Sequence, residues 1–162
     1  MVLIGYKTKS GTTKEAAEVI KKVFVEHNYS VELIELSEVT SIEKYDTIII
    51  GAPINGMQWL PEATKFLKNN EQSLKGKNTA CFALSYIIKD GRKFWKKRIR
   101  RSFKKNSDLI NPIGTKIFGG KVDKPMPGFA RLIFGLSIKN PLNYTDEEKI
   151  KEWAKKIVMS LE

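Results

Sequence analysis

Thr8-Lys9-Ser10-Gly11-Thr12-Thr13 decides the fold because of what lies on either side of it. The apolar run Val2-Leu3-Ile4 precedes it and predicts a buried strand, and apolar residues at helical spacing follow it from Lys14 to Glu26. Strand, loop and helix form the setting of a phosphate-binding loop, in which helix N–H groups and the helix dipole face the anion. Gly11 lets the backbone approach the anion closely. An ordinary strand-to-helix turn is the alternative.

The spacing of glycines excludes two common nucleotide-binding loops. A Walker A loop needs Gly, four residues and then Gly-Lys-Ser/Thr, whereas five residues separate Gly5 from Gly11 and Thr12 follows. A dinucleotide-binding turn needs three glycines in the pattern G-x-G-x-x-G, and this turn contains Gly11 alone. The loop is therefore of another type, rich in hydroxyl side chains and with a single glycine.

Apolar strands alternate with helical patterns along the rest of the chain. Further strands are predicted at 31–36, 45–51, 79–84 and 113–118, and further helices at 61–70, 92–105 and 146–161. Charges interrupt the segment 31–36, which suits an edge strand, and the continuous apolar run of 45–51 suits a central one. Thr145 and Glu148 have the spacing of a capping box at the start of the last helix. The alternation predicts one doubly wound α/β domain over residues 1–162.

Ligands of such sheets bind at the carboxyl ends of the strands, where the strand order reverses. The loop after the third strand contains Pro53-Ile54-Asn55-Gly56, and Asn-Gly is a strong turn signal. Met57 and Trp59 follow, and each is a candidate either to cover a ligand or to pack against the next helix. The loop after the fourth strand begins with Ser85-Tyr86 and ends with Asp90-Gly91, so Tyr86 can form an aromatic wall.

These three loops resemble those of the flavodoxin superfamily, whose FMN phosphate loop reads Thr/Ser-x-Thr/Ser-Gly-x-Thr. The resemblance implies a flavodoxin-like three-layer sandwich with a five-stranded parallel sheet of order 2-1-3-4-5 and helices on both faces. It implies FMN as cofactor, and it places Gly56 where a flavodoxin peptide flips on flavin reduction and presents its carbonyl to the flavin N5–H. Ile88 departs from the pattern, because many flavodoxins have an aromatic residue near it. The FMN-binding residues that the resemblance implies are Thr8, Lys9, Ser10, Gly11, Thr12, Thr13, Pro53, Ile54, Asn55, Gly56, Ser85, Tyr86, Asp90 and Gly91.

Composition is that of a globular protein and excludes several kinds of site. The chain has 162 residues, 41% of them hydrophobic, with one cysteine and one histidine. Cys81 has no partner for an intramolecular disulfide, and a metal cluster of Cys and His is not expected. His27 stands alone at the end of the first helix, which argues against a Ser-His-Asp triad. The N-terminus lacks a signal-peptide pattern, so a cytoplasmic location is expected.

The charge of the chain is concentrated on one predicted helix. Formal net charge is +11, and the segment 89–105 carries ten Lys and Arg against Asp90 alone. Phe94, Trp95, Ile99 and Phe103 alternate with these cations at helical spacing. We therefore expect an anionic partner, either an anionic substrate or an anionic membrane surface, to meet Arg92–Lys105. Nucleic acid is a remoter alternative, which would make the chain a binding module without flavin.

The segment after the fifth strand is the second atypical region. It runs from Gly119-Gly120-Lys121 through an apolar stretch, 129–138, that is too short to span a bilayer. Either it is an interfacial helix, with Met126, Phe129, Leu132, Ile133, Phe134 and Leu136 entering lipid, or it packs as core or lid. The segment resembles flavodoxin-like menaquinone-dependent protoporphyrinogen IX dehydrogenases. The main expectation is an FMN-dependent redox protein with a partner protein or quinone, peripheral on the inner membrane face if bound there. The dehydrogenase is the sharper alternative.

Overall fold

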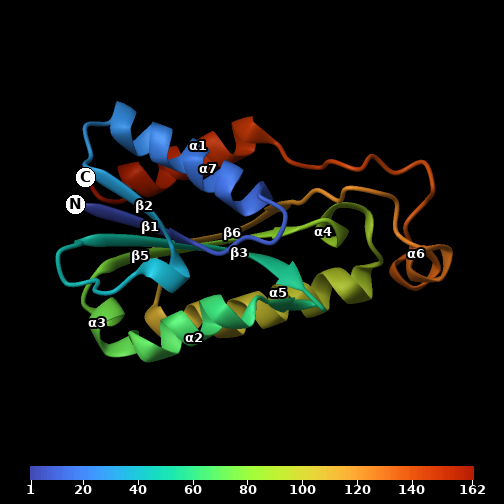
Figure 1. Ribbon diagram of the computed structural model, residues 1–162, viewed down its shortest axis with the longest axis horizontal. Helices are drawn as coiled ribbons and strands as arrows, with labels where there is room; N and C mark the ends of the chain where they lie inside the picture. The colour runs from blue at the N-terminus through green and yellow to red at the C-terminus, as the bar shows by residue number, and fades with distance from the viewer.

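The computed structural model describes all residues from 1 to 162 and contains one twisted sheet between two layers of helices (Figure 1). The strand order is β2-β1-β3-β5-β6, and these five strands are parallel. They comprise β1 Val2–Tyr6, β2 Val31–Glu35, β3 Thr47–Asn55, β5 Asn78–Ser85 and β6 Gly114–Gly119. The predicted flavodoxin-like order is confirmed, with β2 at an edge. The sequence did not reveal the short strand β4, Gln58–Trp59, which pairs antiparallel with the end of β3.

Helices cover both faces of the sheet, as expected. Figure 1 shows α1 and α7 on one face, and α2, α3 and α5 on the other. The helices are α1 Thr12–Glu26, α2 Pro61–Asn69, α3 Glu71–Lys75, α4 Ile87–Asp90, α5 Lys93–Ser107, α6 Gly128–Phe134 and α7 Glu147–Met159. Two 3₁₀ turns, η1 Leu36–Glu38 and η2 Asp108–Ile110, complete the set. No helix is both long and apolar enough to cross a membrane.

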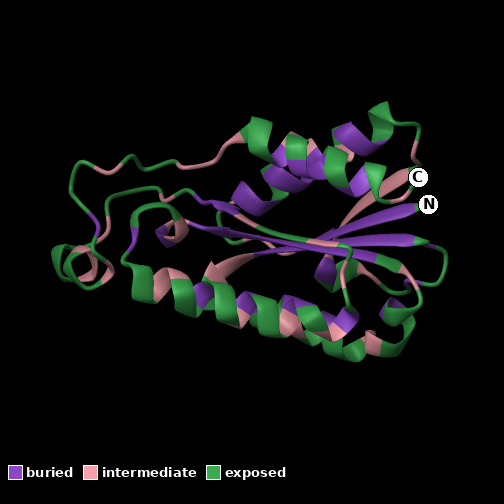
Figure 2. Cartoon of the chain, turned by 180° about the vertical axis from the view of Figure 1, so that it is seen from behind, coloured by how far each residue is buried: buried purple, intermediate pink, exposed green.

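The core consists of two apolar layers, one on each side of the sheet. Successive residues of a strand point to opposite faces, so Ile49 packs under α1 and α7 while Ile48 and Ile50 pack over α2 and α5. Figure 2 shows the buried strands lying between helices whose outer faces are exposed. Burial on both faces explains why β3 reads as a continuous apolar run.

Several helices and strands begin or end at other residues than the sequence predicts. Thr145 does not cap α7; Asp146 is its N-cap and accepts a hydrogen bond from the Lys149 N–H at 3.2 Å. Thr145 instead donates its hydroxyl to Asn143 Oδ1, because a local turn competes for it. The expected loop after β5 is largely the short helix α4, and β3 runs on to Asn55, beyond its predicted end.

The segment between β6 and α7 forms a narrow strap that carries α6 outward. Lys121 and Asn143 form an antiparallel bridge, the Val122 N–H donates to the Leu142 carbonyl at 2.9 Å, and Tyr144 N–H donates to the Gly120 carbonyl at 3.0 Å. The two sides of the strap are thus tied together near the sheet. Figure 1 shows α6 beyond the carboxyl ends of the strands, at one end of the molecule.

Candidate functional site

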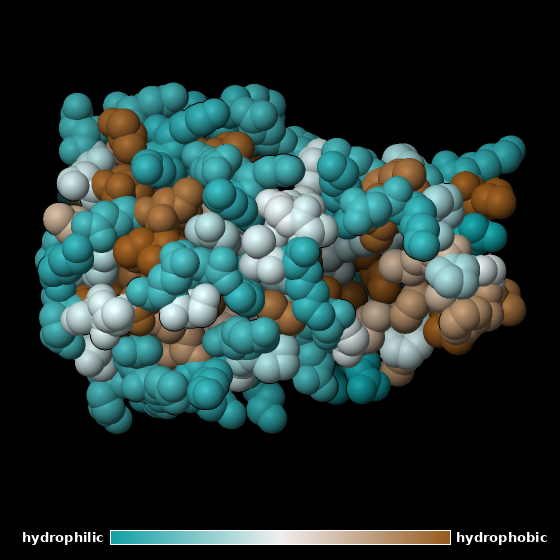
Figure 3. Space-filling view, viewed as in Figure 1, coloured by the Kyte–Doolittle hydropathy of each residue, from teal (hydrophilic) through white to brown (hydrophobic).

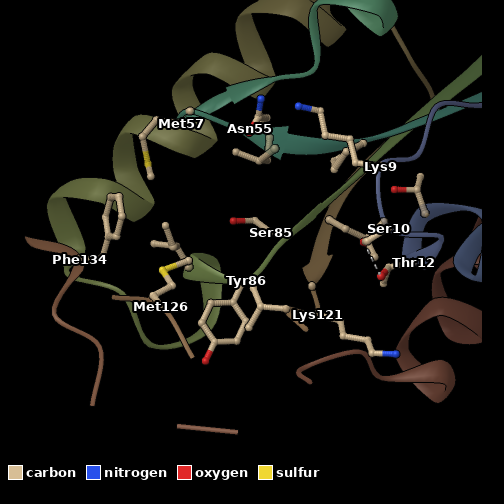
Figure 4. Close-up of a pocket in the computed structure, with 18 residues that line it drawn as sticks. Lys9, Ser10, Thr12, Asn55, Met57, Ser85, Tyr86, Lys121, Met126 and Phe134 are labelled. Carbon is tan, nitrogen blue, oxygen red and sulfur yellow. Dashed lines mark hydrogen bonds between the residues drawn. The ribbon is translucent and has the colours of Figure 1, made fainter. Parts of the chain in front are cut away.

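A pocket of about 280 Å³ lies at the carboxyl ends of β1, β3 and β5, where the strand order reverses. Figure 4 shows its walls: Lys9, Ser10 and Thr12 from the first loop, Asn55 and Met57 from the β3–β4 turn, Ser85 and Tyr86 after β5, and Lys121, Met126 and Phe134 from the strap. Its volume is near the lower end of the range for ligand pockets. The three loops singled out in the sequence therefore meet at one place.

The loop before α1 presents unpaired backbone donors. Gly11 is the N-cap of α1 in the left-handed conformation, with φ of 87°, and no side chain caps the helix. The first helical bond joins the Glu15 N–H to the Gly11 carbonyl at 3.0 Å, and the Gly11 N–H donates to Thr8 Oγ1 at 2.9 Å. The N–H groups of residues 10, 12, 13 and 14 have no acceptor in the protein. An anion at this helix end would satisfy them.

Hydroxyl groups extend this row of donors. Ser10 Oγ lies 3.2 Å from Thr12 Oγ1, and both residues line the pocket together with Thr13. Thr12 and Thr13 are buried, so their hydroxyls are held in place by the surrounding chain. Two serine or threonine hydroxyls within reach of each other suit a phosphate, which accepts several hydrogen bonds at once.

Charge in the pocket also favours an anion. Lys9 and Lys121 line it, no Asp or Glu does, and neither lysine is in an ion pair. In Figure 4, Lys9 lies near Asn55 on one side, and Lys121 lies beside Tyr86 on the other. Two cations and the positive end of the α1 dipole lower the energy of a bound phosphate.

The β3–β4 turn forms a second wall of the pocket, to which Met57 contributes and Trp59 does not. Gly56 and Met57 both have positive φ, 55° and 65°, as a two-residue type I′ hairpin requires. Met57 lines the pocket, whereas Trp59 is buried and donates its Nε1–H to the Ala52 carbonyl at 3.0 Å. Trp59 also packs edge-on against Phe103, with ring centroids 5.1 Å apart. Of the two candidates to cover a ligand, only Met57 is positioned to do so.

Tyr86 lines the pocket but also has a partner within the protein. Its ring packs on Tyr144, with centroids 5.1 Å apart, and its hydroxyl donates to the Pro141 carbonyl at 2.8 Å. Burial, with a further contribution from the charge of Asp90, raises the pKa of Tyr86 above its ordinary value. The strap thus fixes the ring that the sequence identified as an aromatic wall.

Four of the residues expected at the site do not line the pocket. Thr8 and Gly11 shape the first loop from behind, as described above. Asp90 accepts hydrogen bonds from the Tyr144 hydroxyl and from Asn140 Nδ2, so it ties the strap to α4. Gly91 packs tightly under α4, where an added Cβ would lie 2.3 Å from Ile87 Cγ2. The residues from the sequence that do line it are Lys9, Ser10, Thr12, Thr13, Pro53, Ile54, Asn55, Gly56, Ser85 and Tyr86.

The FMN-binding residues expected from the sequence left out the wall that the strap supplies, although packing of this segment as core or lid was one of the two alternatives. This wall includes Gly120, where an added Cβ would lie 2.9 Å from the Tyr86 N–H nitrogen, and the side chains of Val122, Met126 and Phe134. The Gly119-Gly120 pair at the end of a predicted strand was the one available signal. Leu84 and Ile87 complete the apolar lining.

Doubly wound order, a pocket at the reversal point and an uncapped, hydroxyl-rich helix start define a phosphate-binding α/β protein. The chain belongs to the flavodoxin-domain family, whose model matches residues 3–146. It is 33% identical over 84 residues to a curated protein named "Probable flavodoxin 1" from Bacillus subtilis (strain 168), a match that covers 49% of this chain and 53% of that protein. The matched region thus spans about half the length of that relative.

Solved structures agree with this fold. Rubredoxin oxygen:oxidoreductase from the anaerobe Desulfovibrio gigas superposes with a TM-score of 0.64 at 16% identity, covering 99% of this chain and 35% of that one. A mutant flavodoxin from Fusobacterium nucleatum, bound to flavin mononucleotide, superposes with a TM-score of 0.56 at 16% identity, covering 98% of this chain and 95% of that one. At these identities, the likeness supports the fold alone.

Proposed function

We propose that this chain binds FMN in the pocket at the sheet reversal point and transfers electrons to a redox partner. FMN is the cofactor that flavodoxin-domain membership indicates. The observation that carries the proposal is the start of α1, where four backbone N–H groups have no acceptor in the protein and the adjoining pocket is lined by no carboxylate. An FMN phosphate there would accept hydrogen bonds from these N–H groups and from the hydroxyls of Ser10 and Thr12.

The remaining walls suit a flat, largely apolar ring. The apolar side chains of Ile54, Met57, Tyr86, Met126 and Phe134 line the pocket, and Figure 4 shows Met57, Met126 and Phe134 at the same end of it. Bound FMN supplies the capacity to take up and release one or two electrons, while the protein positions it and sets its electrostatic surroundings. The strap residues Val122, Met126 and Phe134 would shield a bound ring from water, and the Asn55-Gly56-Met57 turn would offer backbone groups to it. No side chain in the pocket is needed as a catalytic acid or base.

The experiment is anaerobic reduction of the FMN-loaded protein, followed by addition of cytochrome c as an artificial acceptor. The proposal predicts reversible bleaching of the visible flavin bands and transfer of electrons to cytochrome c in amounts matching the flavin content. A flavin that stays bound but cannot be reduced, or that delivers no electrons to the acceptor, would contradict electron transfer while leaving FMN binding intact.

A second candidate function is menaquinone-dependent oxidation of protoporphyrinogen IX. The basic α5 and the apolar α6, from which Phe134 lines the pocket, favour it, because the substrate carries carboxylates and the acceptor is lipid-soluble. The relatives described above are named as flavodoxins or as an oxygen oxidoreductase, and none bears this activity in its name. An anaerobic assay with protoporphyrinogen IX and a menaquinone analogue would follow porphyrin fluorescence. A rate of porphyrin formation no greater than that with free FMN would contradict this second function and leave electron transfer as the one supported.

A further inference from the structure

An apolar patch covers the end of the molecule where α6 lies. We define the tip patch as Phe94, Phe129, Leu132, Ile133 and Ile138, which are among the ten large hydrophobic side chains exposed in the whole chain. Phe129, Leu132 and Ile138 are 71, 72 and 70% exposed, and exposed apolar side chains that cluster mark an interaction site. Figure 3 shows brown and tan side chains gathered at this end of the molecule.

The tip patch is held in place by the rest of the fold. Phe134, Met126 and Leu136 turn inward and pack against Ile87 and Ile99, so for these three residues the second sequence-based alternative, packing as core or lid, is the one observed. The Trp95 Nε1–H donates to the Ile133 carbonyl at 2.9 Å, and the Arg92 N–H donates to the Phe134 carbonyl at 2.8 Å. One side of α6 is therefore anchored on α5, and the other side is presented to solvent.

Cations outnumber anions on the two segments that carry the tip patch, where Asp90 and Asp123 are the nearby carboxylates. Lys124, Arg131 and Lys139 lie on the same segment, and the chain has no Asp or Glu between Lys124 and Thr145. On α5, Lys97, Arg98 and Arg101 follow Phe94 at helical spacing and are exposed. Among the ten cations of residues 89–105, the one ion pair joins Lys104 to Asp108. Unpaired cations next to exposed aromatic and aliphatic side chains are the pattern of a membrane-surface element.

We propose that the tip patch inserts into the interfacial region of an anionic lipid bilayer, with the exposed cations of α5 and the strap bound to lipid phosphates. The shape of the site favours a bilayer over a protein partner. Figure 1 shows α6 projecting beyond the sheet, and a projecting apolar tip can enter lipid without a matching socket. Each cation near an anionic surface strengthens binding roughly fivefold. Membrane contact at this end would place the mouth of the pocket beside the lipid, since Phe134 lines the pocket from the same helix.

The test is flotation of the FMN-loaded protein with phosphatidylcholine vesicles, with and without phosphatidylglycerol. Wild-type protein should float with the anionic vesicles and much less with the neutral ones. The double variant Phe129→Ser/Leu132→Ser should bind anionic vesicles about tenfold or more weakly, because two large apolar groups no longer enter the interface. Neither residue lines the pocket, so its FMN content should be unchanged. The matched control Val25→Ser/Met159→Ser removes two exposed apolar groups elsewhere and should float like wild type.

Charge is tested separately. Lys97→Gln/Arg101→Gln should weaken flotation with anionic vesicles, whereas Lys155→Gln/Lys156→Gln, on the exposed face of α7, should have little effect. Insertion is tested with an environment-sensitive dye on Leu132→Cys, since Cys81 is buried and will not react. The dye emission should shift to the blue with anionic vesicles, and the same dye on Met159→Cys should not shift.

Three results would overturn the proposal. The first is wild-type protein that does not float with anionic vesicles, and the second is a Phe129→Ser/Leu132→Ser variant that floats like wild type. The third is a tighter complex with nucleic acid or an acidic protein that displaces the vesicles and is unaffected by the serine substitutions. Flotation can be measured with or without bound FMN, so failure here is distinguishable from failure of the proposed function.

Discussion

Replacing Thr12 by Ala tests the phosphate site at a single atom. Thr12 is 6% exposed, and its Oγ1 lies 3.2 Å from Ser10 Oγ, with no other polar partner in the protein. A hydrogen bond from this hydroxyl to a charged phosphate is worth about 1.5–3 kcal/mol. Its loss should raise the Kd for FMN by a factor of roughly 10 to 150.

The assay is titration of apoprotein with FMN and, in parallel, with riboflavin, followed by quenching of flavin fluorescence. Riboflavin has the same ring but no phosphate, so Thr12→Ala should leave its affinity nearly unchanged. Thr12→Ser keeps the hydroxyl and should bind FMN almost as tightly as the natural protein. Equal losses for both flavins, or no loss for either, would refute the placement of the phosphate at the start of α1.

Two further predictions concern stability. Gly51→Ala should lower the free energy of unfolding by about 1–3 kcal/mol, because the new Cβ would lie 2.0 to 2.5 Å from the buried Phe82 ring. Thermal unfolding of this variant is compared with that of the control Gly76→Ala, whose new Cβ would have its nearest neighbour at 3.8 Å. Equal melting temperatures for the two variants would contradict the prediction. Burial, aided by the hydrogen bond to Asp90, raises the pKa of Tyr144 to about 12 from 10.0. Because the folded-state pKa is the higher one, the stabilisation is present below pH 10 and is lost as pH rises towards 12. Urea unfolding across this window should show a shallower decline for Tyr144→Phe, and an identical decline would refute the assignment.

The sequence predicted the sheet well because each strand carries its own signal. Val2-Leu3-Ile4 and Tyr45–Gly51 read as buried strands, and the alternation with helices leaves few topologies open. The first loop could also be predicted, since its glycine and hydroxyl residues lie within six consecutive positions. Strand periodicity and loop composition both depend on neighbouring residues, so the sequence shows them directly.

The structure of the strap could not be predicted, because it depends on contacts between residues that are far apart in the sequence. From the sequence, Asp90 is expected at the site. It instead accepts hydrogen bonds from Tyr144 and Asn140, which lie about fifty positions further along the chain, and it does not line the pocket. Trp59 looks like a ligand cover, yet the Ala52 carbonyl and Phe103 hold it in the core. The helical pattern of α6 also could not indicate which side faces inward, since apolar residues lie on both sides.

FMN binding is tested most directly by the visible absorption spectrum of the purified protein after FMN is added and the excess is removed. We expect a yellow protein that retains one FMN per chain, and that retains less after the Thr12→Ala substitution. A protein that retains no flavin at all would contradict the central claim that the pocket at the sheet reversal point is an FMN site.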